Sequence, residues 1–382
     1  MQKEILVRDD PIPGFAGLVR AGPLLFTAGC DGYRDIVDNR IDPQLSGNAA
    51  AQSIHSYRKI ERLLANAGAK PSSVARIDHF TSSQDWLEIR SVIRAQVFGR
   101  PAPHASTGVA AKMAGINMLT TAAIAAADAS DHLVILGGDV FGTPRIATAV
   151  KVGPLIFLSG VRGIVDPRDG SRIDEETPAA FPAQVGLCYE MIGEALQRCG
   201  LSGERVVRVD TYARDRNRLP EERALRAKIA PSMAAVSSMM ALPLGMRGEV
   251  EITVIAAANG HPTKTLTGPR GEVQAVSAGG FVFIGACAGA LDSETGSVRS
   301  DLAGQIGEQI DLAIAALDAR LTKMDSDLSR LVRLEVYLRD IYAERLFLEK
   351  AAPLLSASPP VLLIAGAELE GINEVQLCGI AV

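Results

Sequence analysis

The residue types best suited to nucleophilic and metal chemistry are scattered along this chain. The five cysteines are widely spaced and form no Cys-x-x-Cys pair; they are Cys30, Cys188, Cys199, Cys287 and Cys378. The histidines show no metal-ligand spacing, and the chain has no His-Glu-x-x-His, phosphate-loop or Gly-x-Gly-x-x-Gly motif. We therefore expect no metal and no organic cofactor, so that any chemistry must rest on other polar side chains.

The elements that would position such side chains occur in three similar copies. The segments PLLFTAGCDG, PLIFLSGVRG and GFVFIGACAG each read as an apolar strand entering a small-residue turn, with Phe26, Phe157 and Phe283 at matching places. At 50 or 51 residues beyond each phenylalanine come VARIDHFTSS, VVRVDTYARD and LVRLEVYLRD, which contain Arg76, Arg208 and Arg333. Two unrelated motifs at one fixed separation, found three times, indicate a tandem triplication.

The repeat is as long as a common single domain, which predicts three domains at residues 1–131, 132–260 and 261–382. We call these ranges the first, second and third segments. Each contains strands, an amphipathic helix, the Arg-containing strand, a second helix and a closing strand pair. In the first helices the apolar stripes are Ile54, Tyr57, Ile60 and Leu64; Val185, Cys188, Ile192 and Leu196; and Ile306, Ile310, Ile314, Leu317 and Leu321. This order predicts an α+β layer with helices on one sheet face.

Composition narrows the class of protein. The 382 residues are 47% hydrophobic and 22% charged, which is typical of a globular protein. The formal net charge of −5 argues against nucleic acid as a partner, because such binding requires Lys and Arg to neutralise phosphates. The charged N-terminal stretch and the lack of a long apolar run predict no signal peptide and no membrane partner, and the cysteine pattern suits the cytoplasm.

The strand-to-turn motif LSG, the VxxYxRD-like strand and the closing EITVIAA resemble the Rid (YjgF-type) reactive-intermediate deaminases over essentially the whole chain. The resemblance implies three YjgF-like (chorismate-mutase-like) domains that form a pseudo-threefold trimer within one monomeric chain, with a central sheet barrel and outer helices. It also implies a small-molecule substrate bound between neighbouring domains.

Family members that hydrolyse imines use an Arg on the penultimate strand to hold a carboxylate and a Glu on the final strand to orient water. The resemblance places the Arg position at Ala105, near Ala234 and at Val361, so the usual Arg is missing. It places the Glu position at Thr120, Glu251 and Gln376. Glu251 is therefore the candidate catalytic residue, with a solvated carboxylate on the Glu249, Glu251 and Thr253 strand face as the alternative.

The remaining candidates are possible substrate-binding residues. Arg223 and Arg345, on the second helices, are candidates to replace the missing clamp, with surface pairs to Glu222 and Glu344 as the alternative. Cys30 and Cys287 follow the small-residue turn; burial as small apolar residues is their alternative. In PHASTG, the candidates are His104, Ser106 and Thr107, and an exposed loop histidine is the alternative for His104.

Three functions remain open. The first is a Rid-like hydrolase or deaminase that acts on a small carboxylated imine, enamine or related metabolite. The second is a pseudo-trimeric hydrolase of the chorismatase kind, which acts on a cyclic carboxylate. The third is a non-catalytic binding or scaffold protein that kept the body of the fold and lost the clamp arginines.

Overall fold

The computed structural model describes residues 1–8, 12–35, 40–83, 86–99, 102–174, 177–241, 248–292 and 294–382. The elements of the first segment are β1 (Lys3–Arg8), β2 (Ala16–Ala21), β3 (Leu24–Thr27), β4 (Cys30–Asp31), α1 (Ala49–Ala65), β5 (Val74–Thr81), α2 (Trp86–Phe98), β6 (Ala105–Ala110) and β7 (Leu119–Ala126). Those of the second are β8 (His132–Leu136), β9 (Ala149–Val152), β10 (Leu155–Leu158), α3 (Phe181–Arg198), β11 (Val206–Ala213), α4 (Leu219–Ile229), β12 (Val236–Ala241) and β13 (Val250–Ala257). Those of the third are β14 (Thr263–Thr267), β15 (Val273–Ala278), β16 (Phe281–Ala288), α5 (Ile306–Lys323), β17 (Leu331–Leu338), α6 (Glu344–Leu355), β18 (Val361–Gly366) and β19 (Val375–Ala381).

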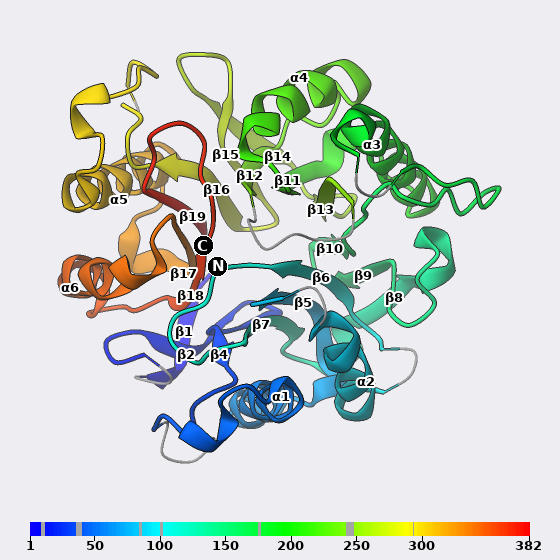
Figure 1. Ribbon diagram of the computed structural model, residues 1–382, viewed down its shortest axis with the longest axis horizontal. Coiled ribbons are helices and arrows are strands. Elements are labelled where there is room, and N and C mark those ends of the chain that lie inside the picture. The colour runs from blue at the N-terminus through cyan, green and yellow to red at the C-terminus, as the bar shows by residue number, and fades with distance from the viewer. Residues whose placement is uncertain are drawn as a thin grey trace.

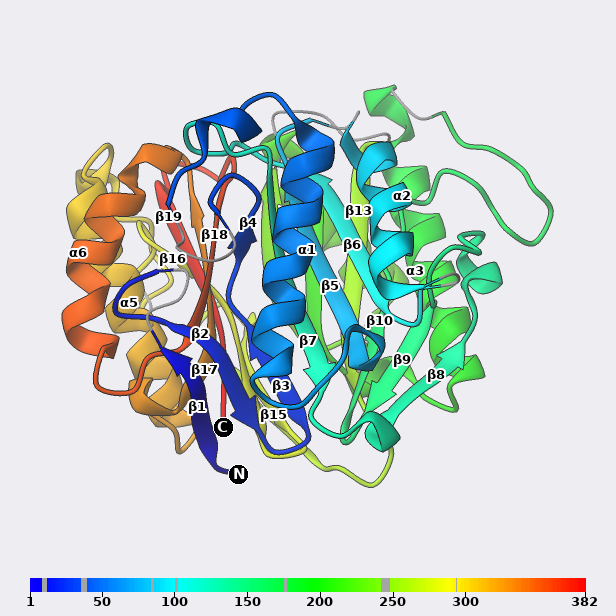
Figure 2. The same ribbon diagram turned by 90° about the horizontal axis from the view of Figure 1, so that it is seen from below.

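Strands occupy the middle of the molecule and helices its outside, which confirms the predicted mixed α+β fold. The pairs α1/α2, α3/α4 and α5/α6 lie at three separate places on the periphery, and both termini lie near the centre of the view (Figure 1). The perpendicular view shows α1 and α2 lying over β5, β6 and β7 (Figure 2). None of the helices in the described ranges is long and apolar enough to cross a membrane.

The strands of the described ranges form two sheets. The larger has the order β14-β15-β16-β19-β17-β18-β2-β3-β7-β5-β6, with β1 on β2 and β4 on β7, and the smaller has the order β12-β11-β13-β10-β9-β8. Each segment contains one parallel pair, formed by β5 with β6, β11 with β12 and β17 with β18. The larger sheet joins the first and third segments because β18 pairs with β2 at Val361 and Ala16.

The apolar stripes of the first helices explain how these helices pack. All four stripe residues of α3 are buried, and Gly68 and Gly200 adopt positive φ just beyond α1 and α3, as glycines that end helices commonly do. In α1 the prediction was wrong at Ile54, which is exposed. The buried stripe of α1 runs instead through Tyr57, Ile60 and Leu64, together with Leu63.

The centre of the molecule is one apolar core shared by all three segments. Phe26, Phe157 and Phe283, which hold matching positions in the three similar sequence motifs, belong to the same buried cluster. A second central cluster contains Phe80, Tyr212 and Tyr337, one aromatic residue from each segment. Side chains of the three segments therefore meet in the interior, in addition to a separate apolar cluster in each segment.

A ring of six charges also lies buried among these strands. Arg76 contacts Asp78 at 2.7 Å and Asp210 at 3.1 Å. Arg208 contacts Asp210 at 2.7 Å and also Glu335. The ring closes through Arg333, which contacts Glu335 and Asp78, each at 2.7 Å. Each carboxylate thus bridges the arginine of its own strand and the arginine of another segment.

Candidate functional site

Glu251 lies on β13, directly opposite Tyr212 of β11. The same ladder position, opposite an aromatic residue of the neighbouring strand, holds Thr120 in the first segment and Gln376 in the third. The positions aligned from the sequence therefore coincide in the sheets. Glu251 is the single acid among these three residues.

The parallel strand pairs locate the position where the resemblance implies a clamp Arg. The residues opposite Arg76, Arg208 and Arg333 are Ala105, Val236 and Val361. The expectation of Ala234 is corrected by two residues, because β12 begins only at Val236 and Ala234 belongs to the preceding turn. The correction leaves the conclusion unchanged, since none of the three residues is an arginine.

The Glu251 carboxylate lies where the second segment meets the first. Its Oε2 accepts a hydrogen bond from Arg162 Nε at 2.8 Å, and its Oε1 accepts one from the backbone N–H of Gly108 at 3.3 Å. Arg162 also donates to the Gly108 carbonyl oxygen at 3.3 Å. We call Glu251, Arg162 and Gly108 the junction site. It joins a buried acid, a cation and a backbone strand from two segments.

The Glu251 side chain and the strand face that carries it are buried and not solvated. Glu251 is 3% exposed, and Glu249 and Thr253 on the same strand face are also buried. The alternative of a solvated strand face does not fit, because all three side chains of this face are buried. A Cβ on Gly160 would clash with Glu251 Oε1, so the absence of a side chain at this position makes room for the carboxylate.

Ser106 connects the two segments through its backbone. Its N–H donates to Ser159 Oγ at 2.8 Å, and its carbonyl accepts from Gly160 N at 3.0 Å. Ser159 Oγ in turn donates to Ala147 O at 2.7 Å. The Ser106 hydroxyl accepts from Arg94 NH1 at 3.1 Å and so is directed to α2, not to Glu251.

Thr107 and His104 are both buried in the first segment. The carbonyl of Thr107 lies 3.3 Å from His79 Nδ1, and His104 Nδ1 lies 3.2 Å from Ala105 O. The ring of His104 also makes an edge contact with Phe98 of α2. His104 is therefore part of the helix–sheet packing, and the alternative of an exposed loop histidine does not describe it.

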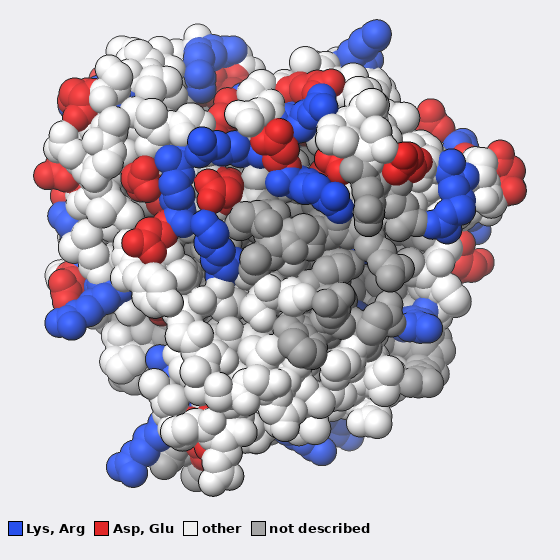
Figure 3. All heavy atoms as spheres, in the orientation of Figure 1, with Lys and Arg blue, Asp and Glu red and all other residues white. Residues whose placement is uncertain are grey.

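Arg223 pairs across two segments rather than with its neighbour Glu222. Its NH1 and NH2 donate to the two carboxylate oxygens of Glu370 at 2.6 and 2.7 Å. These hydrogen bonds raise the pKa of Arg223 above its usual value. Arg223 and Glu370 form an ion pair at 2.6 Å. Figure 3 shows basic and acidic side chains standing next to each other in the upper part of one face of the molecule. The guanidinium of Arg223 is thus already paired with a carboxylate of the protein.

Arg345 lies on the surface, 90% exposed in its side chain, where it pairs with Glu349 at 2.9 Å. The expectation that Arg345 matches Arg223 is also corrected. The turns before α4 and α6 are capped by Asp215 and Asp340, and counting from these caps places Leu348 at the position of Arg223. Neither arginine belongs to the junction site.

Cys30 and Cys287 occupy equivalent places, as the sequence predicts, since β-pairing sets them opposite Thr121 and Leu377. Both are buried in apolar clusters. Burial raises the pKa of the Cys287 thiol, so it stays protonated near neutral pH. The alternative of a small buried apolar residue describes this cysteine.

Arg162 is the residue of the junction site that the sequence analysis missed. It belongs to the LSGVRG turn, and the matching positions hold Asp31 in the first segment and Ala288 in the third. The sequence signal for Arg162 was a basic residue at this turn in the same segment as Glu251. This signal points to Glu251 only once the fold shows that the turn and β13 are neighbours.

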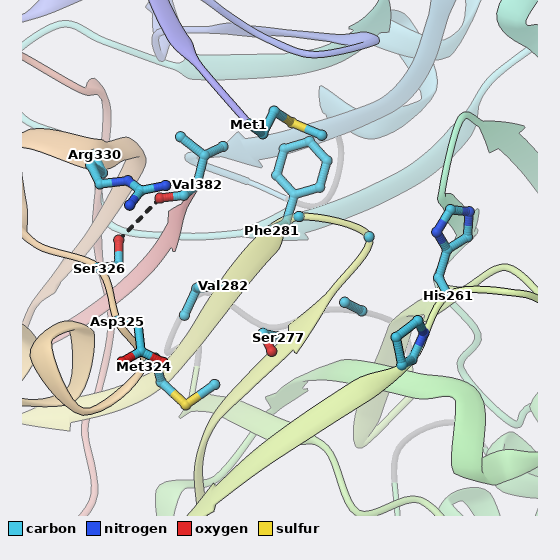
Figure 4. A pocket seen from close by; sticks show the side chains of 14 residues that line it. Met1, His261, Ser277, Phe281, Val282, Met324, Asp325, Ser326, Arg330 and Val382 are labelled. Atoms are coloured by element: carbon cyan, nitrogen blue, oxygen red, sulfur yellow. Dashed lines mark hydrogen bonds between the residues drawn. The ribbon is translucent and has the colours of Figure 1, made fainter.

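Glu251 does not line either of two cavities formed by described residues. One of about 420 Å³ lies near the termini and is lined by Met1, His261, Phe281, Arg330 and Val382 among others; Figure 4 shows Ser326 bonded to the Val382 carbonyl beside it. The other, of about 540 Å³, is lined by Lys112, Asn117 and Tyr342 among others. No cluster of His, Cys, Asp and Glu among the described residues could hold a metal ion.

Comparison with known proteins places the fold. No protein-family model matches the chain. No curated protein matches it either. A solved chorismatase structure matches 81% of this chain and 93% of its own, with 14% identity and a TM-score of 0.54. The chain has a chorismatase-like fold.

Shorter proteins match about a third of the chain. A YjgF/YER057c/UK114-family protein from Mycobacterium tuberculosis matches 33% of this chain and 99% of its own, at 23% identity and a TM-score of 0.27. A Rid-family protein of unknown function from Yersinia pestis matches 33% of this chain and 99% of its own, at 19% identity and a TM-score of 0.29.

Proposed function

We propose that this chain is a cofactor-independent hydrolase or deaminase of a small carboxylated imine, enamine or related metabolite, built from three Rid-like domains around a pseudo-threefold axis. The observation that carries the proposal is Glu251, a buried acid held between two segments by Arg162 and the Gly108 N–H. A buried carboxylate with a specific charged partner at a junction is a common arrangement in active sites.

The chemistry follows from these three groups. Glu251 orients a water molecule and accepts its proton as the water oxygen bonds to the imine carbon. Glu251 passes this proton to the nitrogen, which gives a carbinolamine. The new hydroxyl then gives up its proton to the nitrogen, so that the carbon–oxygen double bond forms as the carbon–nitrogen bond breaks and ammonia leaves. Arg162 supplies the cation for the substrate carboxylate, and its side chain is 28% exposed, so a ligand can reach it from solvent. Arg162 thereby takes the role for which Arg223 and Arg345 were candidates.

One working site per chain is proposed. The positions of Glu251 in the other segments hold Thr120 and Gln376, neither of which can act as a base. In one chain with three domains, each junction can change independently, which accounts for an acid at a single junction.

A chorismatase-like hydrolysis of a cyclic carboxylate is the second candidate, because the fold match to a chorismatase extends over most of the chain. Both reactions need a carboxylate-binding cation and a group that activates water, so the same residues serve either. A non-catalytic binding protein is the third candidate, which the missing clamp arginines favour.

The test measures ammonia release from enzymatically generated 2-iminopropionate and from larger imines, and chorismate hydrolysis in parallel. Because Arg162 does not lie at the usual clamp position, which Val236 holds opposite Arg208, we expect little activity on 2-iminopropionate and turnover of a larger carboxylated substrate. Glu251→Gln should then reduce the rate by about 10²- to 10⁴-fold. Glu349→Gln, which removes an exposed carboxylate, is the matched control and should keep full activity.

Each result decides between the candidates. Turnover of chorismate alone would favour the second candidate. Full activity in Glu251→Gln would remove Glu251 from the mechanism. Inactivity of the wild-type protein on imines, enamines and cyclic carboxylates alike would favour a binding protein.

A further inference from the structure

Five arginines are fully buried among the described residues, and Arg94 differs from the other four. Arg76, Arg208 and Arg333 each contact two carboxylates of the charged ring. Arg320 donates to two backbone carbonyls, those of Gly285 and Ala286. Their positive charges are therefore offset by carboxylates or by carbonyl dipoles of the protein.

Arg94, on α2, is 5% exposed. Within the described part of the chain its one hydrogen bond goes from NH1 to Ser106 Oγ at 3.1 Å, and its Nε has no hydrogen-bond partner. A buried cation with a single neutral partner is costly, because the lost hydration is not replaced by an opposite charge. Burial lowers the pKa of Arg94, in agreement with this environment.

Burial is the first cause of the lowered pKa of Arg94, and Arg145, from the loop of the second segment that meets the first, contributes in the same direction. Tyr57 and His79 lie in the same helix–sheet layer, bonded to each other at 3.0 Å.

In the second segment the same helix–sheet layer contains a buried acid as well as an arginine. On α4 the buried Glu222 accepts hydrogen bonds from Tyr189 and Thr211, and Arg226 follows one helical turn later. Burial and then Glu222 raise the pKa of Tyr189, whereas Arg226 opposes them, so both charges act at one place. The first segment has the buried cation, but no described carboxylate lies within ion-pair distance of it.

We propose that Arg94 and Ser106 form a binding site for a small carboxylate anion in the layer between α2 and β6, beside the junction of the first and second segments. A carboxylate matches the planar guanidinium, whose Nε is available, and Ser106 fixes the orientation of Arg94. The site is distinct from Glu251, because the Ser106 side chain is directed to α2 while its backbone contacts Ser159 and Gly160.

The test follows thermal unfolding of the full-length protein in sodium formate and in sodium chloride at equal ionic strength. We expect formate to raise the midpoint. At a formate concentration of one hundred times Kd, the folded-to-unfolded ratio should increase by about 100-fold. Arg94→Gln should abolish the response, whereas Arg345→Gln, on the exposed face of α6, should keep it. Glu251→Gln should also keep it, which separates this site from the proposed function.

Two further variants keep the proposal testable if Arg94→Gln does not fold. Ser106→Ala removes one hydrogen bond, worth about 1 kcal/mol, and should weaken the apparent formate affinity by about fivefold. Arg94→Met removes an unpaired buried charge and should be at least as stable as the wild type in chloride. A formate response of equal size in the wild type and in Arg94→Gln, or no response in the wild type, would overturn the proposal.

Discussion

Arg333 NH2 of the third segment donates to Asp78 Oδ2 of the first segment at 2.7 Å, in the buried interior. The same contact is repeated by Arg76 with Asp210 and by Arg208 with Glu335. Because each acid also bonds the arginine two residues before it, the three contacts close into a ring that contains every segment. The ring therefore fixes how the segments meet, since a displaced segment would leave both charges buried without partners.

We expect Arg333→Met to destabilise the protein by about 3–5 kcal/mol, because Asp78 and Glu335 would each lose one of two buried partners. Chemical denaturation of the full-length protein measures this loss. Arg345→Met, which removes an exposed arginine, is the control and should change stability little. Equal effects of the two substitutions would show that the ring contributes no more than a surface pair.

Acid should weaken the ring. Burial opposes ionisation of Asp78, but Arg76 and Arg333 outweigh it and hold the pKa of Asp78 below its usual value. Because the pKa of Asp78 is lower in the folded protein than in the unfolded chain, its contribution to stability is complete above the unfolded pKa of about 3.9. This contribution is lost as the pH falls through the folded-state pKa. We expect urea-unfolding free energies to fall below about pH 4. In Arg333→Met, where Asp78 lacks one partner, the fall should be shallower.

The mixed α+β class of the fold was predictable because its sequence signals are local. The apolar stripe of α3 indicates a helix face that packs on the sheet, and the glycines after the first helices indicate where these helices end. Similar patterns elsewhere in the chain make a chance match less frequent. The pairing of β18 with β2 could not be predicted, since a contact between strand edges of distant segments has no periodic signature. The exposure of Ile54 was missed because Leu63 completes the stripe instead.

The candidate site was predictable only in part. Glu251 was found from its position in a closing strand. The strand register confirms this position, but it does not test a catalytic role. Arg162 was missed because its contact with Glu251 depends on how the turn and β13 are placed in space. Arg94 was missed because a helix arginine is usually solvated, and only burial shows that this one is not.

Gly160→Ala should reduce activity about as strongly as Glu251→Gln. The new Cβ would clash with Glu251 Oε1, and displacing the carboxylate would break its geometry with Arg162 and Gly108. Gly186→Ala is the matched control, because Gly186 lies inside α3 with open space at its Cβ position and should gain about 0.5–1 kcal/mol of stability. Steady-state rates and unfolding midpoints of both variants measure these effects. Normal rates in Gly160→Ala would place the reaction away from Glu251.

The second segment, expressed alone as residues 132–260, should not be a well-behaved monomer. It would expose the apolar surface around Phe157, and Arg208 would lose Glu335 of the third segment. Three copies could restore the ring, because Asp210 is the counterpart of Glu335 and could accept Arg208 of a neighbouring copy. We therefore expect a homotrimer or aggregates by light scattering after size-exclusion chromatography.

Asp210→Asn in this fragment tests the proposed source of the trimer. It removes three carboxylates from the restored ring while keeping the apolar surface, and three buried guanidinium groups would be left without their partners. The trimer should therefore be lost and replaced by aggregates. Asp169→Asn, which alters an exposed loop residue, should leave the trimer intact. A folded monomer of the unmodified fragment would contradict the assignment of residues 132–260 as one of three interdependent domains.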